Sequence, residues 1–304
     1  MSKEFLHSYF KKWMKLYKQD FVQPVTYQKY VNAHFHLRLL APKLRLSHLT
    51  RVSYQELLNL YAETHERLTV MDFHHLVKAA ILDAKDEGLV SGDLVRKAVI
   101  KERKPIRHKR VKFLNCLELE NLLSNLILKN EVSWDYFIYL LAKTGLRFSE
   151  ARALTPKDFD FEQNLLKINK TWNYKNKEGG FQGTKNKSSI RVIKIDKQTS
   201  KSFLKLTKGI EENQLIFVKK RVFNSVVNGR LYKLCRQSNI PEISLHGLRH
   251  THASLLLYAE VSVASVSRRL GHSNTAITQE IYLHIVKELE EKDEQKISSF
   301  LETI

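Results

Sequence analysis

Apolar residues recur at three-and-four spacing over long stretches of this 304-residue chain. This is the period at which one face of an amphipathic helix returns. Only 10 glycines and 5 prolines are present, and these two residues are the usual breakers of a helix. We find no internal repeat and no low-complexity tract. The pattern therefore predicts a mainly helical protein.

Three positions carry the signature of a helix start, in which a side-chain oxygen lies three residues before an acidic residue. The pairs are Ser53 with Glu56, Thr69 with Asp72, and Asn115 with Glu118. They predict helices at roughly 54–64, 70–87 and 116–128. Gly88 is expected to end the second helix, because glycine adopts the left-handed conformation at little cost.

One segment departs from the helical period. LLKINKTWNYK (165–175) and IRVIKI (190–195) flank the polar, glycine-containing stretch NKEGGFQGTKNKSS, which predicts two strands and a connection. From Arg221 onward the helical spacing returns. The expected fold class is mainly α, with a small β-hairpin or sheet in the second domain.

A chain of this length is long for one domain and sufficient for two. We expect a helical domain at 1–106 and a second domain at 113–286, joined by a basic linker at 101–112. The linker, KERKPIRHKRVK, holds seven Lys or Arg, one acid and a proline. It is either a solvated loop or a segment that lies along phosphates. The second reading makes these residues DNA contacts: Lys101, Arg103, Lys104, Arg107, Lys109 and Arg110.

Charge favours a polyanionic partner. Lys and Arg number 51 against 32 Asp and Glu, a formal net charge of +19. Residues 1–110 hold 21 basic and 11 acidic side chains, or +10, which leaves +9 for the remainder. A surface of that sign attracts nucleic acid, although many basic proteins bind none. An excess of positive charge in both halves of the chain is what a two-domain DNA clamp requires.

The sequence gives little support to a disulfide-rich, zinc-binding, secreted or membrane protein. Cys116 and Cys235 are the two cysteines and lack the spacing of a disulfide framework or a zinc site. The start, MSKEFLHSYFKKWMK, is broken by charge, and no run approaches the ~18 apolar residues of a membrane span. We expect a cytoplasmic protein that needs no membrane, metal or cofactor.

Candidate chemistry begins with SLHGLRHTHAS, where His246 and Arg249 lie three apart. On the first turn of a helix they would share a face, and free amides there favour an anion. Arginine meets two phosphate oxygens with its planar fork. The H-x-x-R pair alone is weak evidence, because a second match occurs at His48 and Arg51.

Five motifs together are more specific. KTGLRFSEARAL, TKNKSSIR, HGLRHTHAS, LGHSNT and EIYLHI follow one another along the chain. In this order they resemble the catalytic signature of the tyrosine recombinases, the phage integrase family. The resemblance implies a site-specific recombinase that cuts and rejoins DNA through a covalent phosphotyrosyl intermediate.

The resemblance also implies a role for each matching residue. Arg147, in the T-G-x-R turn, and Arg249 would bind the scissile phosphate, with Glu150 as a buried carboxylate orienting the arginine. Lys185 of the hairpin would protonate the departing 5′-hydroxyl, and Lys187 is a rival for that role. Among the histidines, His246 would act as acid or base, His272 would bond the phosphate, and His250 and His252 would be structural neighbours.

Tyr282 matches the family's nucleophile. It lies ten residues after His272 and two before His284, whereas the other eleven tyrosines lack this context. A free phenol has a pKa near ~10, so the hydroxyl must lose its proton as it attacks. The attack would make a 3′-phosphotyrosyl bond and free a 5′-hydroxyl, whose return reverses the step without ATP.

Outside the motifs the resemblance is less specific. Residues 1–106 resemble the core-binding domain of integrases, or form a generic helical bundle. Nothing resembles the small arm-binding domain of many phage integrases, so the chain is either of the two-domain kind or truncated. The tail at 287–304 would dock on a neighbouring protomer, pack on its own domain or fray.

The implied partners are double-stranded recombination sites, a homotetramer on synaptic DNA, and an accessory DNA-bending or directionality factor. The expected place of action is the nucleoid of a bacterial host cell. Integration or excision of a phage or other mobile element is the leading reading. The alternatives are a chromosome-dimer-resolving recombinase, a type IB topoisomerase, and a DNA-binding regulator without chemistry.

Overall fold

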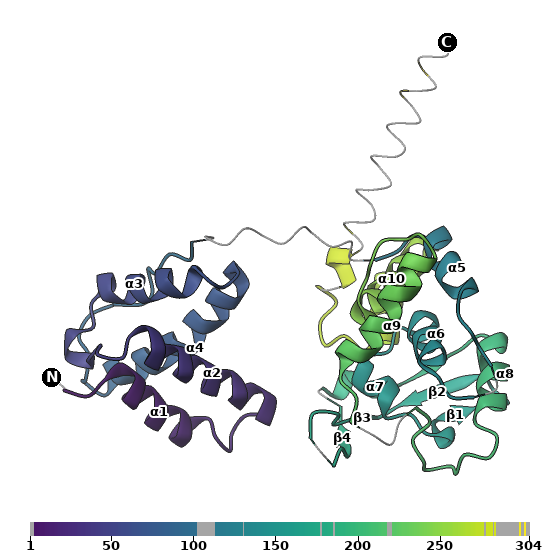
Figure 1. Cartoon of the computed structure of the whole chain (residues 1–304), viewed down its shortest axis with the longest axis horizontal. Helices are drawn as coiled ribbons and strands as arrows, with labels where there is room; N and C mark the ends of the chain where they lie inside the picture. Colours follow the sequence, from purple (N-terminus) through teal and green to yellow (C-terminus); the bar gives the residue numbers. More distant parts are fainter. Residues whose placement is uncertain are drawn as a thin grey trace. The chain divides into compact units, whose positions relative to one another are not determined.

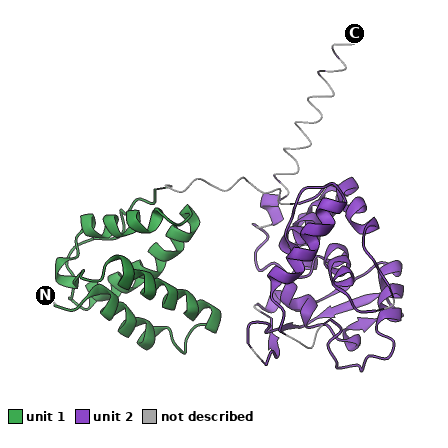
Figure 2. Cartoon of the chain, viewed as in Figure 1, with its two compact units in different colours: residues 1–109 green, residues 110–304 purple. Residues whose placement is uncertain are grey.

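The computed structural model describes residues 3–101, 113–129, 131–176, 178–184, 186–217, 221–276 and 278–281, together with Leu283, Ser298 and Leu301. The chain divides into two compact units, Met1–Lys109 and Arg110–Ile304 (Figure 2). Each unit has a hydrophobic core of its own. Of the linker expected at 101–112, only Lys101 lies within the described residues.

Unit 1 is helical throughout its described part (Figure 1). Its elements are α1 (Leu6–Tyr17), α2 (Pro24–Leu40), the 3₁₀ turn η1 (Leu46–His48), α3 (Arg51–Ala62) and α4 (Arg67–Asp86). Helices α1 and α2 contact each other and both contact α4. On α1 the buried positions Leu6, Phe10 and Trp13 recur at three-and-four spacing, so one stripe of the helix faces the core.

Two of the expected helix starts in unit 1 are wrong by three residues. Helix α3 is capped by Thr50, whose side chain accepts from the Ser53 amide, so Ser53 is the third residue of the helix. Helix α4 begins after Glu66 without a side-chain cap, so Thr69 lies inside it. Gly88 follows α4 with a φ of +73°, as expected.

Polar contacts join the helices of unit 1 across its core. The Trp13 indole donates to Asp83 at 2.6 Å and the Tyr9 hydroxyl donates to Glu87 at 3.1 Å, which ties α1 to α4. The Tyr54 hydroxyl lies 2.9 Å from Nδ1 of His74, joining α3 to α4. Burial, with Lys78 and His75 nearby, lowers the pKa of His74 from 6.5 to about 4.

The stability of unit 1 is therefore expected to fall in mild acid. Between pH 6.5 and about 4 the unfolded chain binds a proton at His74 that the folded chain does not, so protonation favours unfolding. The loss approaches about 1.4 kcal/mol per pH unit. Denaturant titrations across this range should give a shallower pH dependence for His74→Gln than for the control His48→Gln, because His48 is exposed in η1. If the free energy of unfolding depends on pH in the same way in both variants, the lowered pKa of His74 is contradicted.

Unit 2 combines helices with short strands (Figure 1). The helices are α5 (Cys116–Ser124), α6 (Trp134–Thr144), α7 (Phe148–Arg152), α8 (Lys197–Leu206), α9 (Asn224–Gln237), α10 (Leu245–Tyr258) and α11 (Val263–Leu270), with 3₁₀ turns η2 (Pro156–Asp158) and η3 (Lys187–Ser189). The strands are β1 (Phe159–Asp160), β2 (Leu165–Ile168), β3 (Lys170–Trp172), β4 (Phe181–Gly183) and β5 (Arg191–Lys194). The mainly helical fold class with a small sheet is confirmed.

The expected hairpin is a larger structure than two strands. Strands β2 and β5 pair antiparallel, with Leu166 opposite Ile193, and β1 extends this sheet to the order β1-β2-β5. The first predicted strand, 165–175, is divided into β2 and β3, and β3 pairs with β4 of the glycine-containing connection. Polar, exposed strands such as β4 lack the alternation that reveals a strand.

Helix α6 lies at the centre of unit 2. Nearly all its residues are buried, and it contacts α7, α9 and α10. Gly145 ends the helix in the left-handed conformation, with a φ of +66°. Helix α5 starts at the predicted Asn115 and Glu118 capping box, but it ends at Ser124 rather than near 128. The turn after α6 leads directly to the first motif arginine.

Candidate active site

Arg147 is placed by the turn that joins α6 to α7. It is the N-cap of α7, and Glu150 three residues later accepts from its backbone amide at 3.0 Å. The Arg147 guanidinium also donates to Glu150, at 2.7 Å, and to the carbonyl of Gly271 at 3.0 Å. A short helix with its own capping carboxylate thus orients the arginine.

Glu150 serves two arginines. Its side chain is 1% exposed, and Arg191 of β5 donates to both carboxylate oxygens, at 3.3 and 2.9 Å. Burial alone would raise the pKa of Glu150, but the hydrogen bonds and charges of Arg191 and Arg147 outweigh it and lower the pKa. The carboxylate therefore stays ionised and is fully engaged by guanidiniums, which leaves it no proton to transfer at neutral pH.

Arg249 is buried on α10. Ser244 caps this helix by accepting from the Gly247 amide. The Arg249 guanidinium donates to the carbonyls of Gly145 and Leu270, each at 2.7 Å. Burial and the neighbouring Arg147 lower its pKa to about 9, and Glu150 opposes that shift. The group remains a cation at neutral pH.

His246 and His272 lie in the field of these arginines. Burial, followed by Arg249 and Arg147, lowers the pKa of both imidazoles, to about 4 for His272. The His246 ring meets that of His250 edge to face, with centroids 4.7 Å apart. Nδ1 of His272 lies 2.8 Å from the Thr278 hydroxyl. Both histidines are therefore neutral at pH 7 in the free protein.

Three arginines converge on the last turn of α11. The successive carbonyls of Arg269, Leu270 and Gly271 accept from Arg191, Arg249 and Arg147 respectively. The final carbonyls of a helix have no partner within it and lie at its negative end. Guanidiniums from three separate segments therefore donate hydrogen bonds to the free carbonyls at this helix end. Arg147, Glu150 and Arg249, predicted from the motifs, lie in this one hydrogen-bonded group.

Other predicted residues are not tested by the structure. Lys185 and Tyr282 lie outside the described residues, as do Arg103, Lys104, Arg107, Lys109 and Arg110 and most of the tail at 287–304. Lys187, the rival of Lys185, is exposed in η3, and Lys101 is exposed at the end of the described part of unit 1. The roles of these residues stay predictions.

Sequence reasoning assigned no role to Arg191 or Arg269. Arg191 could have been recognised from the sequence. It is two and four residues before the buried Ile193 and Ile195, and alternate residues of a strand point to the same face. An arginine in an inward series needs a buried partner. Arg269 lies on α11 and gives no such signal, since its contacts come from residues distant in the chain.

Gly271 is closely surrounded at a φ of +67°. A Cβ there would lie 2.9 Å from Nη1 of Arg191 and 3.0 Å from the Ser188 carbonyl. Gly271→Ala is therefore expected to lower the free energy of unfolding by more than the roughly 1–2 kcal/mol of a left-handed alanine alone. Gly209→Ala is the matched control, because Gly209 has a φ of +85° and open space around it. Equal losses in denaturant titrations would contradict the close packing.

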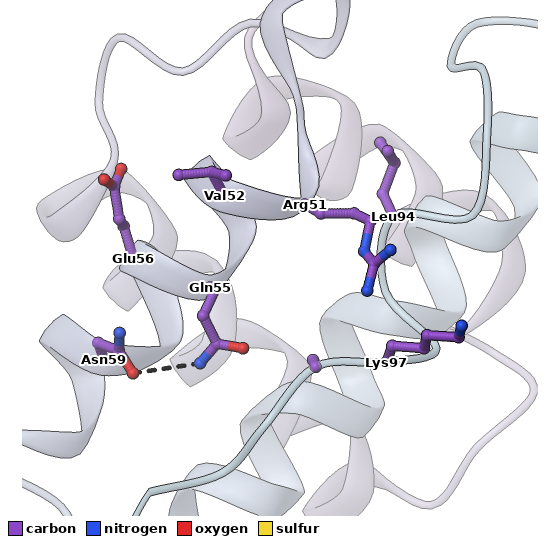
Figure 3. A pocket seen from close by; sticks show the side chains of 8 residues that line it. Arg51, Val52, Gln55, Glu56, Asn59, Leu94 and Lys97 are labelled. Atoms are coloured by element: carbon purple, nitrogen blue, oxygen red, sulfur yellow. Dashed lines mark hydrogen bonds between the residues drawn. The ribbon is translucent and has the colours of Figure 1, made fainter.

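A hollow on unit 1 is a different feature. It has a volume of about 600 Å³ and lies between α3 and the segment after α4. Figure 3 shows Gln55 and Asn59 on α3 facing it, with Leu94 and Lys97 opposite. Gln55 exchanges two hydrogen bonds with the Val99 backbone, at 2.8 and 2.7 Å. This pairing fixes the chain on α3 shortly before Lys101.

Two kinds of feature are absent from the described residues. No group of three or more His, Cys, Asp or Glu side chains is arranged to hold a metal ion there. Within the same part of the chain, every helix is too short or too polar to cross a membrane.

The curated relatives of this chain include integrases. The integrase of Staphylococcus phage L54a is 27% identical over 223 residues, which cover 64% of this chain and 63% of the relative. The ICEBs1 integrase of Bacillus subtilis is 26% identical and covers 66% of this chain and 58% of the relative. The chain thus spans less than two thirds of the length of these relatives.

Solved structures share the fold. The Tn1549 transposon integrase in complex with transposon right end DNA matches with a TM-score of 0.79 at 18% identity, over 95% of this chain and 99% of that one. A lambda integrase tetramer bound to a Holliday junction matches with a TM-score of 0.67 at 16% identity, over 92% of this chain and 78% of that one.

A family model gives the assignment. The model of the phage integrase family matches residues 112–288, more than half of the chain. The match covers all the motifs around Arg147, Arg249 and His272. This chain belongs to the phage integrase family.

Proposed function

We propose that this protein is a site-specific DNA recombinase that cleaves and rejoins strands through a covalent bond to Tyr282. One observation carries the proposal: Arg147 and Arg249 donate to the neighbouring carbonyls of Gly271 and Leu270 at the end of α11, and Glu150 also holds Arg147. Fixed guanidiniums stabilise the charge that develops on a phosphate in the transition state. The two neutral histidines beside them add hydrogen-bonding groups without further positive charge.

The bond changes balance without an outside reactant. The Tyr282 oxygen forms a bond to the scissile phosphorus as the bond to the 5′-oxygen breaks, and the ester is transferred without hydrolysis. The phenol loses one proton and the departing 5′-oxygen gains one. Attack by a 5′-hydroxyl of another strand reverses these changes and restores the free tyrosine.

The histidines take the roles that a neutral imidazole allows. His246 is available to accept or return a proton, because its lowered pKa leaves it unprotonated. For His272, we assign the tautomer in which Nδ1 accepts from the Thr278 hydroxyl, 2.8 Å away, and Nε2 carries the ring proton. Nε2–H then donates to a phosphate oxygen. Lys185 is the proposed acid for the 5′-oxygen, with Lys187 as the alternative.

The proposed partners follow from charge and from the relatives. The substrate is a duplex recombination site, bound by both basic units and by the linker from Lys101 to Arg110. The relatives named integrase favour integration or excision of a phage or other mobile element. Four protomers on synaptic DNA, the tail at 287–304 exchanged between them, and an accessory DNA-bending or directionality factor complete the proposal. The reaction takes place on the nucleoid of a bacterial cell.

Trapping the covalent intermediate tests the function. Duplexes tiled from the DNA that flanks the gene are nicked close to each candidate cleavage point, so that the short 5′-hydroxyl fragment diffuses away. We expect one duplex to become attached to the protein on a denaturing gel, in equal yield with and without EDTA, because guanidiniums supply the positive charge. Absence of an adduct on every duplex contradicts the recombinase, and loss with EDTA contradicts the mechanism.

A further inference from the structure

His252 lies three residues after Arg249 on α10, and so on the same face of that helix. Its Nδ1 lies 3.0 Å from the carbonyl of Ala142, in the last turn of α6. Its Nε2 lies 2.9 Å from Nε of Arg269, in the last turn of α11. One imidazole therefore spans the ends of two helices.

The contacts fix the state of this ring. The guanidinium Nε of Arg269 only donates, so Nε2 of His252 must be the acceptor. Nδ1 then carries the proton and donates to the Ala142 carbonyl. Burial, with Arg269 as the next cause, lowers the pKa of His252 to about 3. A protonated ring would lose its acceptor and would face the Arg269 cation directly.

Both helix ends that His252 joins hold arginines of the site. The turn after α6 supplies the Gly145 carbonyl to Arg249. The end of α11 supplies three carbonyls, of which that of Arg269 accepts from Nε of Arg191 at 2.6 Å. The Arg269 guanidinium is also held by β5, because its Nη1 donates to the carbonyl of Lys194, the last residue of that strand, at 2.8 Å.

We propose that His252 is a positioning residue for the phosphate-binding arginines: it locks the end of α6 to the end of α11 through Arg269, and so fixes the carbonyls that aim Arg249 and Arg147. His252 itself contacts none of the reacting groups. This inference rests on the proposed function of the site.

Three variants separate the two bonds of the ring. His252→Phe keeps a planar ring and removes both bonds. His252→Gln places an acceptor near the position of Nε2, toward Arg269, whereas His252→Asn places a donor near the position of Nδ1, toward Ala142. His48→Phe in unit 1 is the control, because His48 is exposed in η1 and remote in sequence from the motifs of the site.

Single-turnover cleavage of the nicked duplex is the first measurement. His252→Phe is expected to lower the cleavage rate by about 10²-fold, the effect of a small misplacement of catalytic groups, with the Kd for the duplex unchanged. His252→Gln should recover part of the rate and His252→Asn should not. A wild-type rate in His252→Phe, or a glutamine variant no faster than the asparagine variant, would overturn the proposal.

A second measurement does not depend on activity. In protein labelled with ¹⁵N-arginine, the Nε–H of Arg191 reports its bond to the Arg269 carbonyl, and Arg191→Lys identifies its signal. We expect this proton to exchange at least about tenfold faster in His252→Phe than in wild type, as loss of a buried hydrogen bond requires. Unchanged exchange overturns the positioning role, whereas a wild type that forms no adduct contradicts only the recombinase.

Discussion

Replacing Tyr282 by phenylalanine is expected to abolish covalent attachment to DNA while leaving the affinity for the duplex unchanged. The substitution removes one oxygen, and that oxygen is the proposed nucleophile. No other group in the motif context can form a phosphotyrosyl ester. Two quantities are measured with the same protein and duplex: the yield of adduct on a denaturing gel, and the Kd.

Tyr258→Phe is the matched control. Tyr258 is exposed at the end of α10, so the same chemical change there should leave the adduct intact. An adduct that persists in Tyr282→Phe would contradict the assignment and would direct the search to the other eleven tyrosines. An adduct lost in both variants would show that the assay responds to a general change in the protein.

Arg249→Lys is expected to reduce the single-turnover cleavage rate by about 10³-fold, the lower end of the effect of an arginine that stabilises a transferring phosphoryl group. The positive charge is retained, so the loss comes from geometry. The guanidinium bonds two carbonyls, those of Gly145 and Leu270, and still has N–H groups for phosphate. A single ammonium cannot meet the three directions together.

Arg268→Lys provides the comparison at the same helix end. Arg268 is exposed on α11, next to Arg269, and its replacement should leave cleavage unchanged. Rates are measured with the enzyme in excess over a nicked duplex, so that chemistry is separated from binding. If the Arg249→Lys protein cleaves at the wild-type rate, Arg249 supplies charge alone and the fork geometry has no part in the reaction.

The sequence predicted those features whose causes are local. The capping box of Asn115 with Glu118 is correct because both partners lie within one turn. The same reasoning failed at Ser53, where Thr50 three residues earlier provides an equivalent oxygen. Two polar residues at such spacing leave the first residue of the helix undecided.

The site was predictable only as far as its motifs. Arg147 and Glu150 are three apart, and their contact follows from one turn of helix. Arg191 joins Glu150 from 41 residues away, and Arg269 reaches His252 across 17. Such contacts depend on how β5 and α11 pack, which periodicity does not specify. The sequence therefore indicated which groups to propose as phosphate ligands, but not what holds them.

The excess of positive charge around Glu150 has a consequence for the folding stability of the protein. Arg147 and Arg191 are bonded to one carboxylate, and Arg249 lies within the electrostatic influence of all three groups, so folding without a ligand brings mutually repelling cations together. A phosphate diester supplies part of the missing negative charge, and whatever binds only the folded form raises its stability by mass action. We expect DNA to act as a folding ligand for unit 2.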